Sequence, residues 1–243
     1  MSVMRRAFAV ALLLVLTVPA VAHARVVEYQ IQLSPAGDSA AALAVVNVVL
    51  DSADPLPQEV SVPVPRGSTV LWVGEILGGA VDDDPTREPV LERVDDMDVY
   101  TFTLEEARVG QLEIALEPAR ISGDTLSSTM VWTNPGEEVQ VNASVIAEPG
   151  ASDIQLSPPR SGDVQSSDIG ETLHPIEGER VATGESYVIE ASWTRAADAA
   201  AIQGETTDQG LLPLLIGAFV VAVLLLVVVL VRERTRTRLR NDV

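Results

Sequence analysis

Apolar and polar residues alternate along most of the chain between residues 26 and 194. Alternation with a period of two predicts β-strands, because successive side chains of a strand point to opposite faces of a sheet. Each such segment is expected to bury its apolar face and to leave the other face in water. The apolar positions that alternate in this way are Val27, Tyr29, Ile31, Leu33, Val60, Val62, Val64, Tyr100, Phe102, Leu104, Leu112, Ile114, Leu116, Val139, Val141, Val145, Tyr187, Ile189, Ala191 and Trp193.

Two further runs, residues 44–50 and 69–77, are apolar at nearly every position. Such runs are typical of central strands or of strands inside a sandwich, since both of their faces are covered. Turn residues separate the segments, as in Pro65-Arg66-Gly67 and Asn134-Pro135-Gly136. No long amphipathic helix interrupts this pattern, so the sequence predicts an all-β fold.

About a dozen short strands at this spacing predict one or two Ig-like antiparallel β-sandwiches. The alternation is interrupted near residues 120–124, which places one sandwich at residues 25–119 and a second at residues 120–195. A single large sandwich with additional strands is the alternative that the pattern leaves open.

The first 24 residues have the plan of a secretory signal peptide. Arg5 and Arg6 precede an apolar run over residues 7–18, and Ala22-His23-Ala24 is a small-x-small cleavage sequence. An uncleaved signal anchor is the alternative, although the apolar run is short for a membrane span.

Residues 211–231 are uncharged and apolar and predict a single C-terminal transmembrane helix, whose length of about 32 Å matches a bilayer core. Five arginines in residues 232–243 predict a basic cytoplasmic tail by the positive-inside rule. Residues 196–210 are small and polar and predict a flexible stalk. The sequence thus predicts a single-pass type I protein of the cell membrane with an extracellular domain.

The charge is divided unevenly along the chain. The total is −19, but residues 25–210 carry 9 Arg against 33 acidic residues. This excess of acid argues against nucleic acid as a partner, since phosphate backbones need clustered cations. The chain has no cysteine, which excludes disulfides, thiol nucleophiles and thiolate metal sites.

Catalytic patterns are missing from the sequence. His174 is the one histidine after the predicted signal peptide, and its place before Pro175 favours a structural role. No GxSxG, phosphate-binding glycine loop or HExxH is present. The sequence therefore predicts a non-enzyme with no cofactor, and it identifies no small-molecule substrate.

Two acidic clusters are candidates for calcium binding, because calcium prefers several oxygen ligands that converge from loops. The alternative is that they solvate two turns, since their spacing matches no calcium motif. The candidate ligands are Asp82, Asp83, Asp84, Asp95, Asp96 and Asp98.

Sugar-binding sites commonly use exposed aromatic faces, so the three tryptophans are candidates for such a site. Trp72, Trp132 and Trp193 all lie within strand patterns, and the last two fall on apolar faces. Their burial in the core is favoured over a binding role.

Residues 141–159, the turn that contains His174 and residues 180–195 resemble the membrane-proximal part of a loose group of bacterial single-pass membrane proteins. The features that carry the resemblance are the PGASDIQLSPP stretch, Pro149 to Pro159, and the closing strand with its turn at Ala182-Thr183-Gly184. Members of this largely uncharacterised group have a signal peptide, a β-sandwich ectodomain and a C-terminal anchor. The resemblance implies this architecture and no activity.

The strands, the anchor and the missing catalytic set together predict a non-enzymatic, membrane-anchored, extracytoplasmic binding or scaffold protein that acts through protein–protein contacts with an envelope protein. Two alternatives remain open. One is an accessory subunit of a membrane enzyme or transporter, and the other is a calcium- or carbohydrate-binding adhesin-like module.

Overall fold

The computed structural model describes residues 25–35 and 41–196. The predicted signal peptide, most of the stalk, the predicted transmembrane segment and the basic tail lie outside these residues. Within the described residues, no helix combines the length and the apolar character that a membrane crossing requires.

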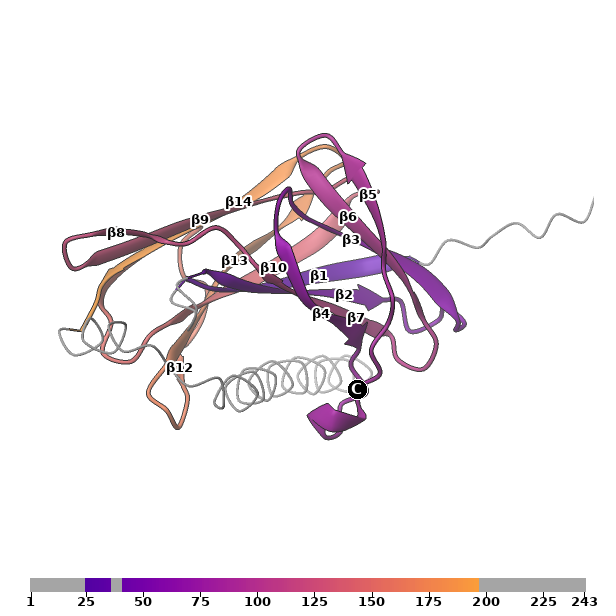
Figure 1. The fold of residues 1–243 in the computed structure, drawn as a ribbon, viewed down its shortest axis with the longest axis horizontal. Coiled ribbons are helices and arrows are strands. Elements are labelled where there is room, and N and C mark those ends of the chain that lie inside the picture. The colour runs from indigo at the N-terminus through magenta and orange to yellow at the C-terminus, as the bar shows by residue number, and fades with distance from the viewer. Residues whose placement is uncertain (1–24, 36–40, 197–243) are drawn as a thin grey trace, which may run out of the picture.

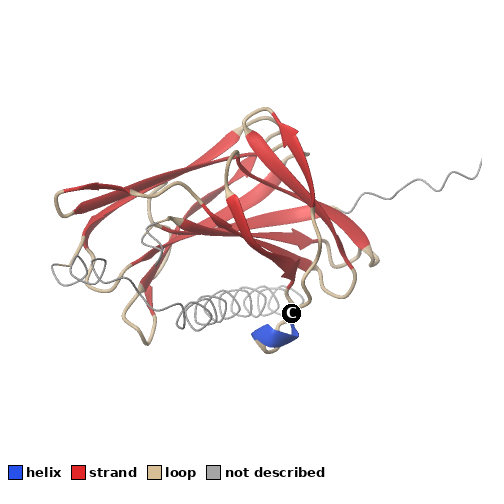
Figure 2. Ribbon diagram, viewed as in Figure 1, coloured by secondary structure: helices blue, strands red, loops and turns tan. Residues whose placement is uncertain are grey.

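The described chain is all-β, as predicted, and forms three sheets with one short 3-10 helix, η1 (Val81–Asp83) (Figures 1 and 2). The large sheet has seven strands in the order β12 (Gln165–Ser166), β13 (Thr172–Val181), β10 (Val139–Ala147), β1 (Val26–Ser34), β2 (Leu43–Leu50), β7 (Val109–Ala115) and β4 (Thr69–Glu75). The four-stranded sheet has the order β11 (Ser152–Ser157), β14 (Ser186–Thr194), β9 (Thr125–Thr133) and β8 (Arg120–Ser122). The three-stranded sheet has the order β3 (Gln58–Pro65), β6 (Met97–Leu104) and β5 (Val90–Val94).

The two smaller sheets lie on the same side of the large sheet (Figure 2). The apolar positions of the alternating segments meet between these layers in one buried cluster. At its centre the rings of Tyr29 and Trp132 lie 4.9 Å apart, and the Tyr29 hydroxyl donates a 2.7 Å hydrogen bond to the Ser61 carbonyl oxygen on β3. Trp132 and Trp193 are fully buried here, as predicted.

The large sheet joins the two regions that the sequence pattern separates at residue 120. β1 pairs with β10 from Glu28 opposite Gln140 to Leu33 opposite Val145, and the buried cluster contains residues from both regions. The two regions therefore share one sheet and one buried cluster. The β1–β10 pairing is parallel, so the expectation of wholly antiparallel sheets is wrong at this pair.

β2 and β4 are the two strands whose sequences are apolar on both faces. β2 lies inside the large sheet, between β1 and β7, whereas β4 is its outermost strand. The free edge of β4 is covered by the segment that follows η1. The Glu75 amide donates to the Pro85 carbonyl oxygen at 3.0 Å, and the Arg87 amide donates to that of Val73 at 2.9 Å. This cover explains how an edge strand tolerates so apolar a sequence.

Candidate functional site

The face of the large sheet that points away from the buried cluster carries mostly carboxamide and carboxylate side chains. We call this surface the polar face. Its polar residues are Glu28, Gln30 and Gln32 on β1, Asn47 on β2, Gln111 and Glu113 on β7, and Gln140, Asn142 and Ser144 on β10. The apolar Val45 and Val49 of β2 and Ile146 of β10 lie on the same face. These residues alternate with core residues along each strand, which is why sequence alternation places them together on one face.

Strand register aligns four carboxamides in a row across the polar face. Gln30 lies opposite Asn47 on one side and Asn142 on the other, and Asn47 lies opposite Gln111. We call these four residues the carboxamide row. Neighbouring strands are about 4.8 Å apart, so the row extends over roughly 14 Å across β7, β2, β1 and β10.

Part of the polar face is satisfied by its own hydrogen bonds. Glu28 Oε1 accepts from Gln30 Nε2 at 2.9 Å and from Asn142 Nδ2 at 2.8 Å. Gln140 Nε2 donates to Asn142 Oδ1 at 3.2 Å, and Gln111 Nε2 donates to Glu113 Oε1 at 2.8 Å. These bonds fix the orientation of the carboxamides, because the NH₂ group of each donor side chain points toward its acceptor. The carbonyl oxygens of Gln30 and Gln111 therefore point away from Glu28 and Glu113.

Several other polar atoms on this face are buried and have no hydrogen-bond partner in the part of the chain that the structure describes. They are Gln30 Oε1, both amide atoms of Gln32, Asn47 Oδ1 and Gln111 Oε1. The side chains of Gln111, Asn47 and Gln32 are only 1%, 3% and 5% exposed. A buried carbonyl or amide without a partner costs about 1–3 kcal/mol, so these groups lower the stability of the fold unless water or another group satisfies them.

Trp72 lies at the β4 end of the carboxamide row. It shares the polar face with Gly74, which is opposite Gln111, while Val73 between them points into the core. A Cβ atom at position 74 would lie 2.5 Å from both Cη2 and Cζ2 of Trp72, so this side of the six-membered ring packs against the glycine. The indole is half-buried, unlike the core position favoured by its sequence pattern. It adds an aromatic surface next to the carboxamides.

Glu113 is the carboxylate nearest the aromatic end of the row, opposite Trp72 on β4. Burial raises the pKa of this carboxyl group above its ordinary value, and the hydrogen bond from Gln111 only partly opposes that change. The sequence pattern predicted that Glu113 and Gln32 would be solvated, whereas both are buried. The pattern could not show this, because it identifies which face a residue occupies and not what surrounds it.

A second buried carboxylate, Glu75, closes the other side of β4. Its Oε1 accepts from Arg87 Nε at 2.7 Å and from the Glu105 amide at 2.8 Å, and its Oε2 accepts from the amides of Glu106 and Ala107 at 2.8 and 2.6 Å. Burial opposes ionisation, but these backbone amides and Arg87 outweigh it and hold the pKa of Glu75 below its usual range. The carboxylate is fully satisfied within the fold, so it has a structural role.

The calcium candidates of the first cluster lie around η1. Asp82 and Asp83 belong to this short helix, and Asp84 follows it. Asp84 Oδ1 accepts the Leu77 amide at 2.8 Å, which closes the loop between β4 and η1.

The second cluster lies at the β5–β6 hairpin, a different part of the fold. Asp95 and Asp96 form the turn, while Asp98 on β6 is buried, accepts the Gly67 amide at 3.1 Å and lies 3.5 Å from Arg93 Nε. Within the described residues, no group of three or more His, Cys, Asp or Glu side chains is arranged to hold a metal ion. We therefore place no calcium site in the function proposed below.

His174 lies on β13 and is buried, with its Nε2 atom 2.9 Å from Thr172 Oγ1. Burial, with a smaller contribution from Arg160, lowers the pKa of the imidazole. Neither residue lines the cavity described next.

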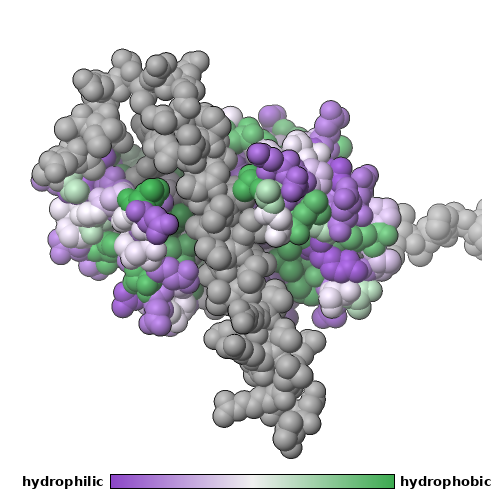
Figure 3. All heavy atoms as spheres, turned by 90° about the horizontal axis from the view of Figure 1, so that it is seen from below, coloured by the Kyte–Doolittle hydropathy of each residue, from purple (hydrophilic) through white to green (hydrophobic). Residues whose placement is uncertain are grey.

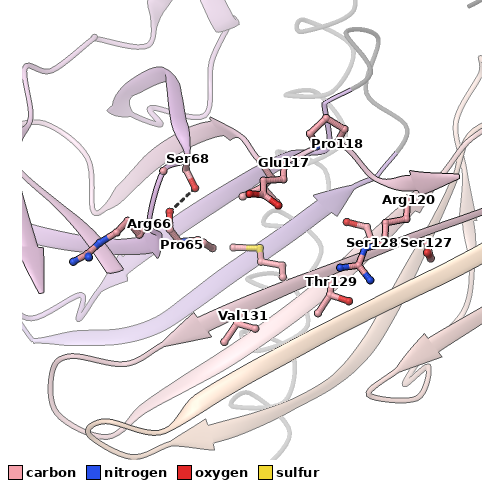
Figure 4. A pocket seen from close by; sticks show the side chains of 13 residues that line it. Pro65, Arg66, Ser68, Glu117, Pro118, Arg120, Ser127, Ser128, Thr129 and Val131 are labelled. Carbon is pink, nitrogen blue, oxygen red and sulfur yellow. Dashed lines mark hydrogen bonds between the residues drawn. The ribbon is translucent and has the colours of Figure 1, made fainter. Parts of the chain in front are cut away.

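A cavity of about 500 Å³ opens where the β3–β4 turn, the β7–β8 connection and β9 meet (Figure 4). Its lining combines Arg66 and Arg120 with Ser128 and Thr129 around the thioether of Met130. Figure 4 shows Arg120 reaching toward the hydroxyl side chains of β9. No buried unsatisfied polar atom lines this cavity in the described part of the chain.

The comparisons with known proteins add no family. No family model matches the chain, and no curated protein matches it. Among solved structures, the fold has a TM-score of 0.36 to native leukotriene A4 hydrolase from Saccharomyces cerevisiae, at 9% sequence identity. The alignment covers 69% of this chain and 28% of that chain. A similarity of this size carries no argument about fold or activity.

Proposed function

We propose that the chain is a non-enzymatic, membrane-anchored, extracytoplasmic binding module, and that the polar face of the large sheet is its recognition surface. The fold is then a single Ig-like sandwich in which the two smaller sheets cover one face of the large sheet and the other face binds. The predicted signal peptide and C-terminal anchor support a β domain on the outer side of the cell membrane and a tail in the cytoplasm.

The observation that supports this proposal is the all-β fold, in which both smaller sheets cover one face of the large sheet and the other face aligns polar side chains of four neighbouring strands. The same groups do not suit catalysis. Carboxamides do not exchange protons near neutral pH, and Glu28 and Glu113 are both engaged by carboxamide NH₂ groups.

Co-purification of the full-length tagged protein from its native membrane tests this proposal. The wild type is compared with a Gln32→Leu/Gln111→Leu variant and with Gln155→Leu, which changes an exposed glutamine on β11 of the four-stranded sheet. Mass spectrometry identifies the proteins, and sugar analysis the polysaccharides, that accompany each form.

We expect one envelope component to accompany the wild type and Gln155→Leu, and to be lost from the double variant. Thermal melting by circular dichroism checks that all three forms are folded. Equal recovery of every component with all three forms, or recovery of no component after cross-linking in the membrane, would contradict the proposal. A stoichiometric membrane enzyme or transporter that stays with the double variant would favour the accessory-subunit alternative.

A further inference from the structure

β9 has an open backbone edge beside the cavity shown in Figure 4. β14 pairs with β9 along its whole length, whereas β8 pairs with it only over residues 125–127. From Ser128 to Thr133, no second strand pairs with β9 among the residues that the structure describes. Residues 127–131 form one wall of the cavity, so the cavity lies against this stretch of edge.

Hydrogen bonds at the two ends of β9 show which of its backbone groups face the open edge. The Asp124 carbonyl oxygen, just before β9, and the Asn134 amide, just after it, bond to residues that flank β14, at 2.8 and 3.0 Å. Alternate residues of a strand direct their backbone groups to the same edge, and the β9–β14 register runs without a shift. The N–H and C=O groups of Thr129 and Val131 therefore point to the open edge.

Prolines on the neighbouring segments explain why this edge is not completed by the chain. If the β8–β9 pairing continued past the end of β8, Pro118 would lie opposite Thr129, and proline has no N–H to donate. β3 borders the cavity on its other side. The amide of Arg66 bonds toward the β5–β6 turn, so Pro63 and Pro65 are at the positions of β3 that face away from β6. Neither segment can act as a full partner strand, because each lacks the N–H groups that the edge requires.

The residues along this edge are accessible from solvent. Val131 is 44% exposed, and Thr129 and Arg120 are exposed as well. Met130, between the two edge residues, directs its thioether into the cavity wall together with Leu116. An added strand would thus find backbone groups at its side and an apolar wall under its inward-facing side chains.

Arg120 gives this edge a positive charge. Its side chain reaches toward β9 (Figure 4), and no ion pair joins it to a carboxylate of the described residues. Arg66 is engaged differently, because it donates to the Asp95 carbonyl oxygen. Glu117 is the acid of the cavity lining. An unpaired guanidinium beside a strand edge favours a ligand that brings a carboxylate, since the two groups form strong, charge-assisted hydrogen bonds.

We infer that the open edge of β9 binds an extended peptide segment of a partner protein, which adds to the four-stranded sheet as a further strand. Main-chain hydrogen bonds to Thr129 and Val131 supply the affinity, and alternate side chains supply the specificity. One apolar side chain is directed toward Met130, and one acidic side chain pairs with Arg120. This site is separate from the polar face, so the inference goes beyond the proposed function and does not depend on it.

A broad protein interface fits the described surface less well than a strand edge does. The buried centre of such an interface is rich in apolar and aromatic side chains. Here the exposed large apolar side chains are spread over β4, β5, β8, β9 and β14. In the view from below, polar and apolar residues alternate in small patches over the visible described surface (Figure 3). A partner that binds mainly through its backbone needs no wide apolar patch.

The test uses the full-length protein in mild detergent and a phage-displayed library of random peptides about ten residues long. Selected sequences are synthesised, and their binding is measured by fluorescence polarisation. Each backbone amide of the tightest peptide is then methylated in turn, which removes one N–H donor at a time.

Two pairs of variants examine the site. Val131→Pro removes an edge N–H that has no ladder partner, and Val131→Thr keeps this N–H. Arg120→Gln removes the charge. Arg160→Gln is its matched control, since Arg160 is also exposed and does not line the cavity.

We expect the selected peptides to contain Asp or Glu and to lack proline in the paired stretch. Val131→Pro and Arg120→Gln should each weaken binding about tenfold or more, because each removes a direct hydrogen-bonding group. Val131→Thr and Arg160→Gln should change binding less than about threefold. Methylation should weaken binding at alternate positions, since alternate amides of an added strand face β9. Thermal melting checks folding, and if Val131→Pro does not fold, Arg120→Gln and the methylation series decide the result.

Several outcomes would overturn the inference. These are enrichment of no peptide over detergent micelles alone, wild-type binding by both Val131→Pro and Arg120→Gln, and methylation effects without alternation. Competition by free acetate or phosphate as strong as that of the peptide itself would show a simple anion pocket instead. A wild-type dimer in sedimentation that Val131→Pro converts to a monomer would show that a second copy of the chain occupies the edge.

Discussion

Two regions on either side of β4 bury polar groups in opposite ways. Glu75 has four hydrogen-bond donors from three backbone amides and Arg87, and every acceptor site of its carboxylate is used. The polar face buries four carboxamides whose oxygens have no donor within the described chain. Since an unmade buried hydrogen bond is costly, the first arrangement stabilises the fold and the second lowers its stability. The comparison teaches that burial alone does not show what a polar group does for the fold, because its hydrogen-bond partners decide whether it adds stability or costs it.

The largest expected change in stability comes from replacing Glu75, the carboxylate whose hydrogen bonds are all made within the fold. Glu75→Gln should lower the free energy of unfolding by roughly 3 kcal/mol, because the carboxamide cannot accept all four bonds and Arg87 loses its buried counter-charge. Urea denaturation measures this. The control Glu105→Gln removes an exposed carboxylate 3.2 Å from Arg87 and should change stability by less than about 0.5 kcal/mol.

The direction in which pH changes the effect of Glu75→Gln can also be predicted. The pKa of Glu75 is lowered in the folded protein, so its stabilisation is present above the unfolded-state pKa and is lost as pH falls through the folded-state pKa. The difference between wild type and Glu75→Gln should therefore shrink on acidification. A difference that stays constant with pH would contradict the role given to the carboxylate.

A smaller effect of opposite sign is expected on the polar face. Gln32→Leu replaces two unpartnered amide atoms with a side chain of similar volume and should raise the free energy of unfolding by about 1 kcal/mol. The exposed Gln155→Leu should leave it within about 0.5 kcal/mol of wild type. Destabilisation by Gln32→Leu in urea melts would show that its amide has a partner after all. Gain of stability with loss of binding is the combination expected of a ligand site.

The smallest effect concerns Glu113. The pKa of Glu113 is raised in the folded protein. The folded state therefore loses stability relative to the unfolded state as pH rises from the unfolded-state pKa of this group to its folded-state pKa. Glu113→Gln should remove this loss and make the melting temperature less dependent on pH above the ordinary glutamate pKa of about 4.3. Below the unfolded-state pKa the two proteins should melt alike. Calorimetric melting across this pH range is the measurement, and an unchanged slope would be evidence against the assigned shift.

Alternation along the sequence predicted the fold class and the composition of the core well. Tyr29, Phe102, Ile114 and Trp193 all point into the buried cluster, because a period of two fixes which residues share a face once a strand forms. The parallel pairing of β1 with β10 could not be predicted in this way. Pairing between distant strands depends on the packing of the whole sandwich, and no local pattern records it.

The sequence predicted only part of the candidate site. The polar positions of β1 were recognised as one face, but the row forms only when register aligns Gln30 with Asn47, Gln111 and Asn142 from three other strands. Trp72 was expected in the core because it lies within the apolar strand pattern of residues 69–77, and a bulge between Val70 and Trp72 was not foreseen. A single acid inside an otherwise apolar run was the one available sign of the buried Glu75.

The central position of β1 has a consequence for how the domain reaches its native state. Its hairpin partner β2 is adjacent in sequence, but its other neighbour is brought in by the pairing of residue 28 with residue 140. Contacts over such distances slow folding, since a long loop must close first. For a chain exported N-terminus first, as we propose, β1 keeps an open edge until β10 has also crossed the membrane. Open strand edges invite aggregation, so export of this domain is expected to depend on a chaperone that holds the N-terminal half until the sheet can close.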